Sequence, residues 1–182
     1  MLLLAIRSPR ATARGLASAL LLALVAAGGA ASAGVAELDA QHGFRDVRFG
    51  ETFESFEGLR LLTDAGANGS SLFTRPADDL RYGEANLDGV TYGFYAGRLY
   101  FVTLFTSGER NGRAMLAELE RSYGPGQSSS EHALEYVWQG SRVRLHYRMD
   151  QATSMGMAVL TSVEMDASVA ADRASLPAAI AP

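Results

Sequence analysis

The stretch Val90–Thr106, VTYGFYAGRLYFVTLFT, decides the fold class of this chain. Every second residue from Val90 to Phe94 is large and apolar, which is the two-residue period of a β-strand whose faces differ. Ala96-Gly97 supplies a two-residue turn, and the run Leu99–Thr106 is apolar in both alternating sets. Because a strand that is apolar on both sides lies inside a sheet, we expect a β-hairpin whose second strand is central.

A second hairpin is expected further along the chain. Leu134–Gln139 and Arg142–Met149 both alternate, and Gly140-Ser141 lies between them as a two-residue turn. This register gives three apolar pairs on one face: Trp138 with Val143, Tyr136 with Leu145, and Leu134 with Tyr147. A last strand is expected near Met155–Val163.

Two helices are expected beside these strands. Thr52 can cap a brief helix that carries the apolar residues of 53–59, and a helix of about four turns is expected over Glu109–Tyr123. Gly124-Pro125 ends the longer helix, because proline cannot continue it. Further short strands are expected over Phe44–Gly50, Leu59–Thr63 and Leu72–Arg75. The sequence therefore predicts an α+β fold, an antiparallel sheet with both helices packed on one face.

The N-terminal segment has the composition of a secretory signal peptide. Residues 1–36 contain three arginines and no acid, an apolar run occupies Leu16–Ala27, and Ala31-Ser32-Ala33 offers a cleavage site. We therefore expect residues 1–33 to be removed, so that the exported protein begins at Gly34. The alternatives are an uncleaved anchor, for which the apolar run is short, and a mitochondrial-type presequence, which the unbroken Leu/Ala block disfavours.

Composition restricts the chemistry of the exported chain. The chain has 182 residues, with 16 basic residues that are all Arg and 20 acidic residues. Removing the first 33 residues takes away three Arg and no acid, which leaves 13 basic residues, 20 acidic residues and a net charge of −7. Such a chain has no basic excess for binding nucleic acid. The absence of Cys excludes disulfides and thiolate chemistry and fits a bacterial periplasm.

The exported chain divides into one domain and two flanks. Residues 34–43 are expected to form a flexible leader, and residues 44–163 the α+β domain. Residues 164–182 are rich in Ala and nearly free of large apolar side chains, so we expect a disordered tail. No stable membrane span is expected after signal cleavage, and the expected location is periplasmic or secreted.

Four stretches resemble a family of exported bacterial domains whose activity is uncharacterised. Phe44–Gly50 matches an F-x-x-V-x-F-G opening, Tyr92–Leu99 an aromatic Y-G-F-Y-x-G-R-L hairpin, Leu116–Gly124 a helix that ends in Tyr-Gly, and Tyr136–Trp138 a strand with Trp. The sequence Tyr-Gly-Pro-Gly departs slightly from the family's Y-G-x-P ending. The resemblance implies a periplasmic address and this fold, and it implies no site.

One strand face carries the clearest cluster of bases. Arg142, Arg144, His146 and Arg148 are spaced by two, so all four side chains would line one face. Because guanidinium groups pair with carboxylates and phosphates, this strip would suit an anionic partner. The alternative is a solvated face balanced by Glu135 and other acids of the neighbouring strand. His146 opposite Glu135 would also resemble an acid–base pair, but no nucleophile accompanies it.

Tyr95 and Tyr100 are the second candidate for partner binding. They belong to an aromatic cluster in which most rings are expected in the core: Tyr82, Tyr92, Phe94, Phe101 and Phe105. Tyr95 and Tyr100 share a face across the Ala96-Gly97 turn and would line a groove there. The alternative is that these two rings are core residues as well.

Other groups of polar residues in the sequence do not form a complete site. Glu84–Gly89 begins like a calcium loop, but position 12, where a bidentate acid belongs, is Tyr95. Asp78 and Asp79 are expected to be exposed loop residues. We expect no catalytic residue, no metal site and no cofactor.

The function that these observations favour is binding without catalysis. The expected partner is a protein or peptide of the cell envelope, engaged by a sheet face or an exposed edge strand. The alternative is a periplasmic protein that binds a small ligand or lipid in an aromatic groove.

Overall fold

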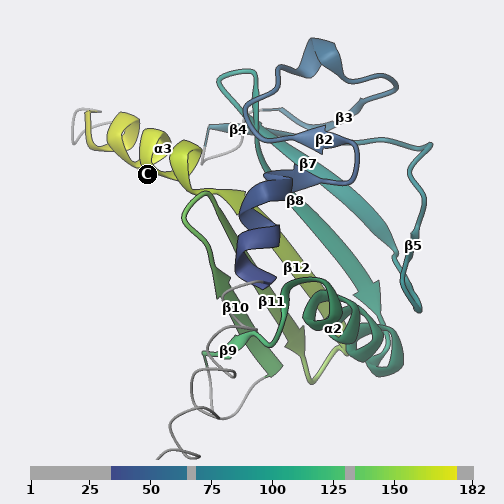
Figure 1. Cartoon of the computed structure of the whole chain (residues 1–182). Coiled ribbons are helices and arrows are strands. Elements are labelled where there is room, and N and C mark those ends of the chain that lie inside the picture. The colour runs from purple at the N-terminus through teal and green to yellow at the C-terminus, as the bar shows by residue number, and fades with distance from the viewer. Residues whose placement is uncertain (1–33, 65–68, 130–133, 176–182) are drawn as a thin grey trace, which may run out of the picture.

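The structure, a computed structural model, describes residues 34–64, 69–129 and 134–175 (Figure 1). The predicted signal peptide, residues 1–33, and the end of the predicted tail, residues 176–182, lie outside the described residues. Among the described residues, no helix has both the length and the apolar character needed to cross a membrane.

Eight antiparallel strands form the main sheet. In spatial order they are β3 (Arg60–Thr63), β4 (Ser70–Thr74), β7 (Gly89–Tyr95), β8 (Arg98–Ser107), β12 (Met155–Ser162), β11 (Val143–Asp150), β10 (Leu134–Gln139) and β9 (Gln127–Ser128). Each half is a meander that ends at a central strand, and the two central strands, β8 and β12, pair with each other. The predicted hairpin with a central second strand is confirmed, and both turn residues, Ala96 and Gly97, have positive φ.

The remaining elements are short hairpins and helices. β1 (Gly43–Phe44) pairs with β2 (Val47–Arg48), and β5 (Arg81–Tyr82) pairs with β6 (Ala85–Asn86). The helices are residues 34–41, the 3-10 helix η1 (Phe53–Ser55), α2 (Glu109–Tyr123) and α3 (Val163–Ser175). The prediction of a single strand over Phe44–Gly50 is wrong, because the chain reverses at Arg45, whose φ of 54° is left-handed, and forms the β1–β2 hairpin.

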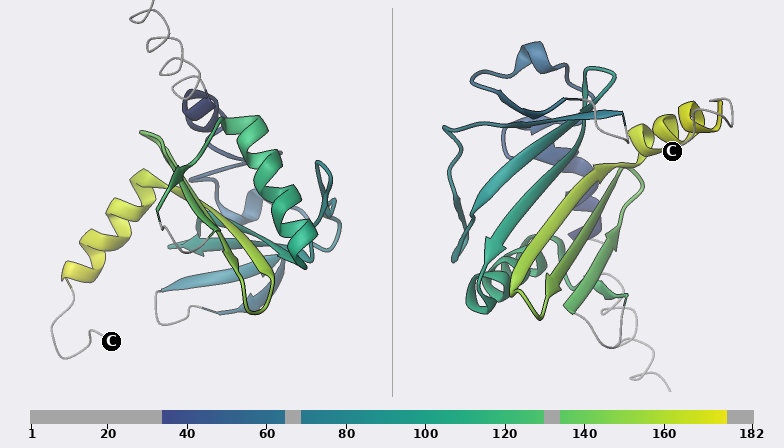
Figure 2. Two further views of the ribbon diagram at one scale, coloured as in Figure 1. Left: turned by 90° about the horizontal axis from the view of Figure 1, so that it is seen from below. Right: turned by 180° about the vertical axis from the view of Figure 1, so that it is seen from behind.

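The helix α2 packs on one face of the sheet, which we call the inner face; the other is the outer face (Figure 2). Large buried side chains on the inner face include Tyr92, Leu99, Val102, Leu104, Trp138, Leu145, Tyr147 and Leu160. Two glycines allow the close approach of α2: a Cβ on Gly156 would lie 3.2 Å from the Cα of Gly112. The Tyr147 hydroxyl donates a hydrogen bond of 2.8 Å to the Gly112 carbonyl, which fixes α2 against β11.

The prediction that two helices pack on one face is not confirmed. The expected brief helix is only the three-residue η1, and none of its residues is buried. The helix α3 contacts the outer face: its Asp166 meets Arg144, which alternates along β11 with the inward-facing Val143 and Leu145. The α+β class and the antiparallel sheet are as predicted.

The prediction of a flexible leader over residues 34–43 is wrong. Residues 34–41 are helical, and Leu38 is fully buried in the core. The Asp39 carboxylate accepts hydrogen bonds from the backbone N–H groups of Ser141 (2.7 Å), Arg142 (2.9 Å) and Val143 (2.9 Å). Partial burial opposes ionisation of Asp39, but these bonds and one from the Ser141 hydroxyl outweigh it and hold the pKa of Asp39 below its ordinary value.

The predicted register of the second hairpin is wrong by two residues. The turn between β10 and β11 is longer than the predicted Gly140-Ser141, because Asp39 binds the N–H groups of residues 141–143. The strands pair two residues further on: Trp138 with Leu145, Tyr136 with Tyr147, and Leu134 with Met149. A shift of two residues keeps every side chain on its predicted face.

The prediction of a disordered tail from residue 164 is also wrong for its described part. Residues up to Ser175 form α3, which leaves the sheet directly from the end of β12 and projects away from it (Figure 1, Figure 2). The sequence has few large apolar residues here, and polar contacts to the sheet hold the helix instead.

Candidate functional site

The outer face of the central strands is apolar in its middle. Its side chains alternate with the buried inner ones and are half-buried: Phe101 and Phe105 on β8, Met157 and Val159 on β12, and Val137 on β10. The ring of Phe101 lies directly on the backbone of Gly93, where a Cβ would come within 2.2 Å of it. Glycine at position 93 therefore lets an aromatic ring lie flat across the outer face.

Helix α3 covers one end of this face through carboxylates. The Asp166 carboxylate accepts a hydrogen bond of 2.5 Å from the Tyr100 hydroxyl and one of 2.9 Å from Arg144. The Asp172 carboxylate accepts a hydrogen bond of 2.9 Å from the Tyr95 hydroxyl. Between these two acids lies Val169, the one buried residue of α3. Arg144 of the predicted Arg strip and both members of the predicted tyrosine pair thus bind the same helix.

The ionisation of these groups favours the contact. Burial and the hydrogen bond to Asp166 raise the pKa of Tyr100 to about 12, so its hydroxyl remains a donor at neutral pH. The bond from Tyr100 and the guanidinium of Arg144 hold the pKa of Asp166 below its ordinary value, against the effect of partial burial. The bond to Asp172 likewise raises the pKa of Tyr95. The hydroxyls of Tyr95 and Tyr100 therefore remain hydrogen-bond donors to the carboxylates of α3 at this end of the outer face.

The predicted Arg strip is only partly on this face. Arg142 is in the turn, where its backbone N–H binds Asp39, so its placement on the strand face is wrong. Arg144 lies under α3, and the exposed Arg148 lies beside Met157 on the open part of the face. His146 points the same way, and its Nε2 is 2.6 Å from a Glu135 carboxylate oxygen.

The pairing of His146 differs from the predicted one. Glu135 stands directly opposite Arg148, and Val137 stands opposite His146, so the contact between His146 and Glu135 is diagonal. This contact places the two groups together as predicted, but through a different register.

The open part of the outer face has a shallow hollow at the end away from α3. The hollow has a volume of about 240 Å³, and Phe105, Arg148, Asp150, Met155 and Met157 are among the residues that line it. Met155 is 48% exposed, which is high for a large apolar side chain on a sheet. Two flexible methionines thus lie beside an aromatic ring, a guanidinium and the Asp150 carboxylate at this end of the outer face.

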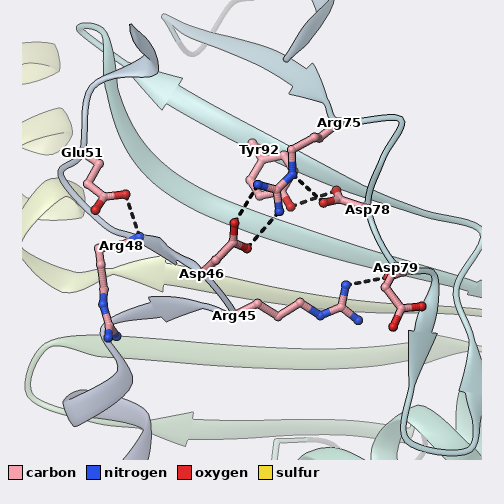
Figure 3. Close-up of polar contacts among 8 residues, drawn as sticks. All are labelled: Arg45, Asp46, Arg48, Glu51, Arg75, Asp78, Asp79 and Tyr92. Atoms are coloured by element: carbon pink, nitrogen blue, oxygen red, sulfur yellow. Dashed lines mark hydrogen bonds and ion pairs between the residues drawn. The ribbon is translucent and has the colours of Figure 1, made fainter. Parts of the chain in front are cut away.

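A second cluster, which the sequence did not reveal, ties the β1–β2 hairpin to the sheet (Figure 3). Arg75 makes a two-pronged ion pair with Asp46 at 2.8 and 2.9 Å and a third bond of 2.7 Å to Asp78. Asp78 also accepts a hydrogen bond of 2.9 Å from the buried Tyr92. The Asp78 side chain is only 3% exposed, so its prediction as an exposed loop residue is wrong.

This cluster has the character of a structural lock. The bonds to Asp46 and Asp78 raise the pKa of Arg75, and burial together with the bond to Asp78 raises the pKa of Tyr92, so neither gives up its proton near neutral pH. The four side chains hydrogen-bond to one another, so the cluster ties the β1–β2 hairpin to the sheet.

Another hollow lies beside the β1–β2 hairpin. It is an open groove of about 670 Å³ lined in part by Arg45, Arg48 and Arg121. These guanidinium groups have structural partners. Arg45 donates to the carbonyl of Asp79 (Figure 3) and to that of Arg81. Arg48 donates to the carbonyl of Gln41, and Arg121 to the Glu118 carboxylate. The guanidinium groups of the groove are therefore engaged in contacts within the protein, at the junction of the β1–β2 hairpin with its neighbours.

The partial calcium motif is part of a hairpin. Residues 85 and 86 form β6, and the Asp88 carboxylate accepts a hydrogen bond of 2.5 Å from Ser107. In the described ranges, no group of three or more His, Cys, Asp or Glu side chains is placed to hold a metal ion.

Comparisons with known proteins identify no function. No protein-family model matches the sequence, and no curated protein matches it significantly. Among solved structures, the chain is similar to a DUF4309 family protein (YjgB) from Bacillus subtilis subsp. subtilis str. 168, with a TM-score of 0.31 and 16% sequence identity. That match covers 53% of this chain and 66% of that one, and a similarity this low supports no argument about function.

Proposed function

We propose that this protein is an exported bacterial binding module that acts without catalysis, and that a protein or peptide of the cell envelope docks on its outer face. The observation that carries the proposal is the open part of that face, where Phe105, Met155 and Met157 lie beside Arg148. The outer face of an antiparallel sheet is normally polar where it meets water. A patch of aromatic and methionine side chains in that position is typical of an interaction surface.

A protein partner is favoured over a small ligand or lipid. A small-ligand site usually has a volume of about 300–1,000 Å³, whereas the hollow on the outer face has about 240 Å³. The tyrosine pair does not form an aromatic groove, because α3 covers it and both hydroxyls bind carboxylates of that helix. A flat face with an apolar middle and charged rim fits a protein surface better.

The signal peptide expected at the N-terminus favours a partner in the cell envelope. The charged start, the apolar run and the Ala-Ser-Ala exit of the first 33 residues are typical of a signal peptide, and a chain without Cys needs no disulfide in the periplasm. Helix 34–41 adds a structural argument, because Leu38 and Asp39 are part of the folded domain immediately after the proposed cleavage site.

The first prediction concerns this cleavage. The protein isolated from the periplasm of a bacterial host is expected to begin at Gly34, because Ala31-Ser32-Ala33 offers small residues at the positions that signal peptidase reads. Intact-mass spectrometry of the purified protein measures this directly. A periplasmic protein that retains Met1–Ala33, or a protein that remains in the cytoplasm, would contradict the export part of the proposal.

The second prediction concerns the docking face. The exported protein, used as bait in an envelope extract, is expected to capture a partner, and the double variant M157D/R148E to bind that partner at least about tenfold more weakly, since it loses an apolar contact and a charge pair. Capture is measured by quantitative mass spectrometry and affinity by titration with the purified partner. Binding is also expected to weaken with salt, because exposed charges are screened beyond about 8–10 Å.

Matched controls separate the outer face from the rest of the surface. L62D changes an apolar side chain that is 55% exposed on the edge strand β3, and R110E reverses an exposed charge on α2, which lies over the inner face. Both controls are expected to bind the partner as the wild type does. Loss of binding in L62D alone would place the partner on the edge strand instead, and equal capture by M157D/R148E would refute the outer-face proposal.

A further inference from the structure

Helix α3 is held to the outer face by a small contact. Val169 is its one buried residue, whereas α2 buries four residues against the inner face. The ion pair between Arg144 and Asp166 is 42% and 37% exposed at its two side chains, and such exposed pairs contribute little to stability. An isolated helix of 13 residues is also marginal in water. The docked state of α3 is therefore only weakly favoured, and another segment can displace it.

The place that α3 occupies is specific for carboxylates. Tyr95, Tyr100 and Arg144 each donate a hydrogen bond to an aspartate of α3. Asp166, Val169 and Asp172 recur every three residues, so an acid, an apolar residue and a second acid lie along one side of the helix. The sheet thus recognises a short pattern: two carboxylates that flank one apolar side chain.

The same face carries further side chains along its strands, away from α3. Phe105, Met157 and Arg148 extend the outer face away from Tyr100, and they combine an apolar patch with an unburied cation. A partner that occupies the place of α3 and also reaches these residues would gain contacts in addition to those that Asp166 and Asp172 make.

We propose that α3 is an internal competitor for an acidic protein segment, and that the partner inserts a helix with the same pattern of two carboxylates around an apolar residue. This inference rests on the proposed function, because it names the chemistry of the partner for that face. Binding of such a segment requires that α3 leave the sheet, so the fraction of molecules with α3 undocked sets the apparent affinity. The chain has a net negative charge, and Tyr95, Tyr100 and Arg144 supply donors for acids at this part of the sheet.

The test uses a synthetic peptide with the sequence of residues 163–175, acetylated and amidated at its ends. It is titrated to millimolar concentration into the exported form of the wild type and of the variant D166N/D172N, whose own helix has lost both carboxylates. NMR signals of the Tyr95 and Tyr100 rings report binding. The variant is expected to bind the peptide at least about tenfold more tightly than the wild type, because its site is free for a larger fraction of the time.

Two further variants and a second peptide test whether binding depends on the release of α3 and on the two carboxylates. E164Q removes an exposed acid of α3 that does not face the sheet tyrosines, and it is expected to bind the peptide as weakly as the wild type. V169A loosens α3 without a change of charge and is expected to bind more tightly. A peptide with Asn in place of both Asp residues is expected to bind D166N/D172N at least about tenfold more weakly, because charge-assisted bonds are lost.

Three results would overturn the inference. They are equal binding of the peptide by the wild type and by both loosened variants, equal binding of the two peptides, and no change in the tyrosine signals of the loosened variants up to millimolar peptide. None of these readouts uses an envelope partner. Failure here together with a captured partner that needs Met157 and Arg148 would leave the proposed function intact, and success here without any captured partner would refute the proposed function alone.

Discussion

Replacement of Trp138 by alanine is expected to lower the free energy of unfolding by about 3–5 kcal/mol, which is a large share of the roughly 5–15 kcal/mol that stabilises a typical domain. The Trp138 side chain is 1% exposed, and its Nε1–H donates a hydrogen bond of 2.7 Å to the carbonyl of Gly124 at the end of α2. The indole also lies against the backbone of Gly126. The mutation therefore removes a packed ring and leaves a cavity where β10 meets the segment after α2.

Thermal unfolding followed by circular dichroism measures this effect, and we expect a decrease in Tm of about 10–20 °C. The control W138F keeps one aromatic ring but loses the bond to Gly124 and the contact of the distal indole ring with Gly126, so it is expected to cost less than W138A but more than the hydrogen bond alone. A W138A protein that melts within about 2 °C of the wild type would mean that the ring is not packed between the sheet and the end of α2.

The second large effect is expected at Asp78. The mutation D78A leaves the guanidinium of Arg75 with Asp46 alone and leaves the buried hydroxyl of Tyr92 without its acceptor. Removing one partner of a buried polar network costs more than the network itself contributes, so we expect a loss of about 2–4 kcal/mol. Urea unfolding, with the slope of the transition held in common between variants, measures it.

The neighbouring residue Asp79 provides a matched control. It is exposed, and its carboxylate accepts one hydrogen bond of 2.8 Å from the backbone of Arg81. D79A is therefore expected to cost less than about 1 kcal/mol. If D78A and D79A lower stability equally, the cluster around Arg75 does not lock the β1–β2 hairpin to the sheet.

The parts of the fold that the sequence predicts are those that local pattern decides. The alternation through Val90–Phe94, the turn at Ala96-Gly97 and the apolar stripe of Glu109–Tyr123 each arise within about 15 residues, and the structure confirms all three. Tyr95 and Tyr100 share a face as predicted, but alternation alone does not place every residue: the register shifts between Gly93 and Phe94, so the adjacent Tyr100 and Phe101 both lie on the outer face.

The missed features depend on contacts between residues far apart in the chain. Asp39 binds a turn about 100 positions away, and no local signal could show that it shifts the register of the β10–β11 hairpin. Asp78 and Asp79 look alike in sequence, and only the approach of Arg75 and Tyr92 buries the first of them. α3 has too few apolar residues for its periodicity to indicate a docked helix, since polar bonds to the sheet position it.

The pairing of β8 with β12 determines when the fold can be completed. Among the described strands, only β8 and β12 pair one meander with the other, and β12 comes about 50 residues after β8 in the chain. When the chain emerges N-terminus first, from a ribosome or through a membrane pore, one side of β8 stays unpaired until Met155–Ser162 has also emerged. The apolar strand at the centre of the finished domain is thus the most vulnerable segment of the unfinished one, and it needs protection from aggregation during transit.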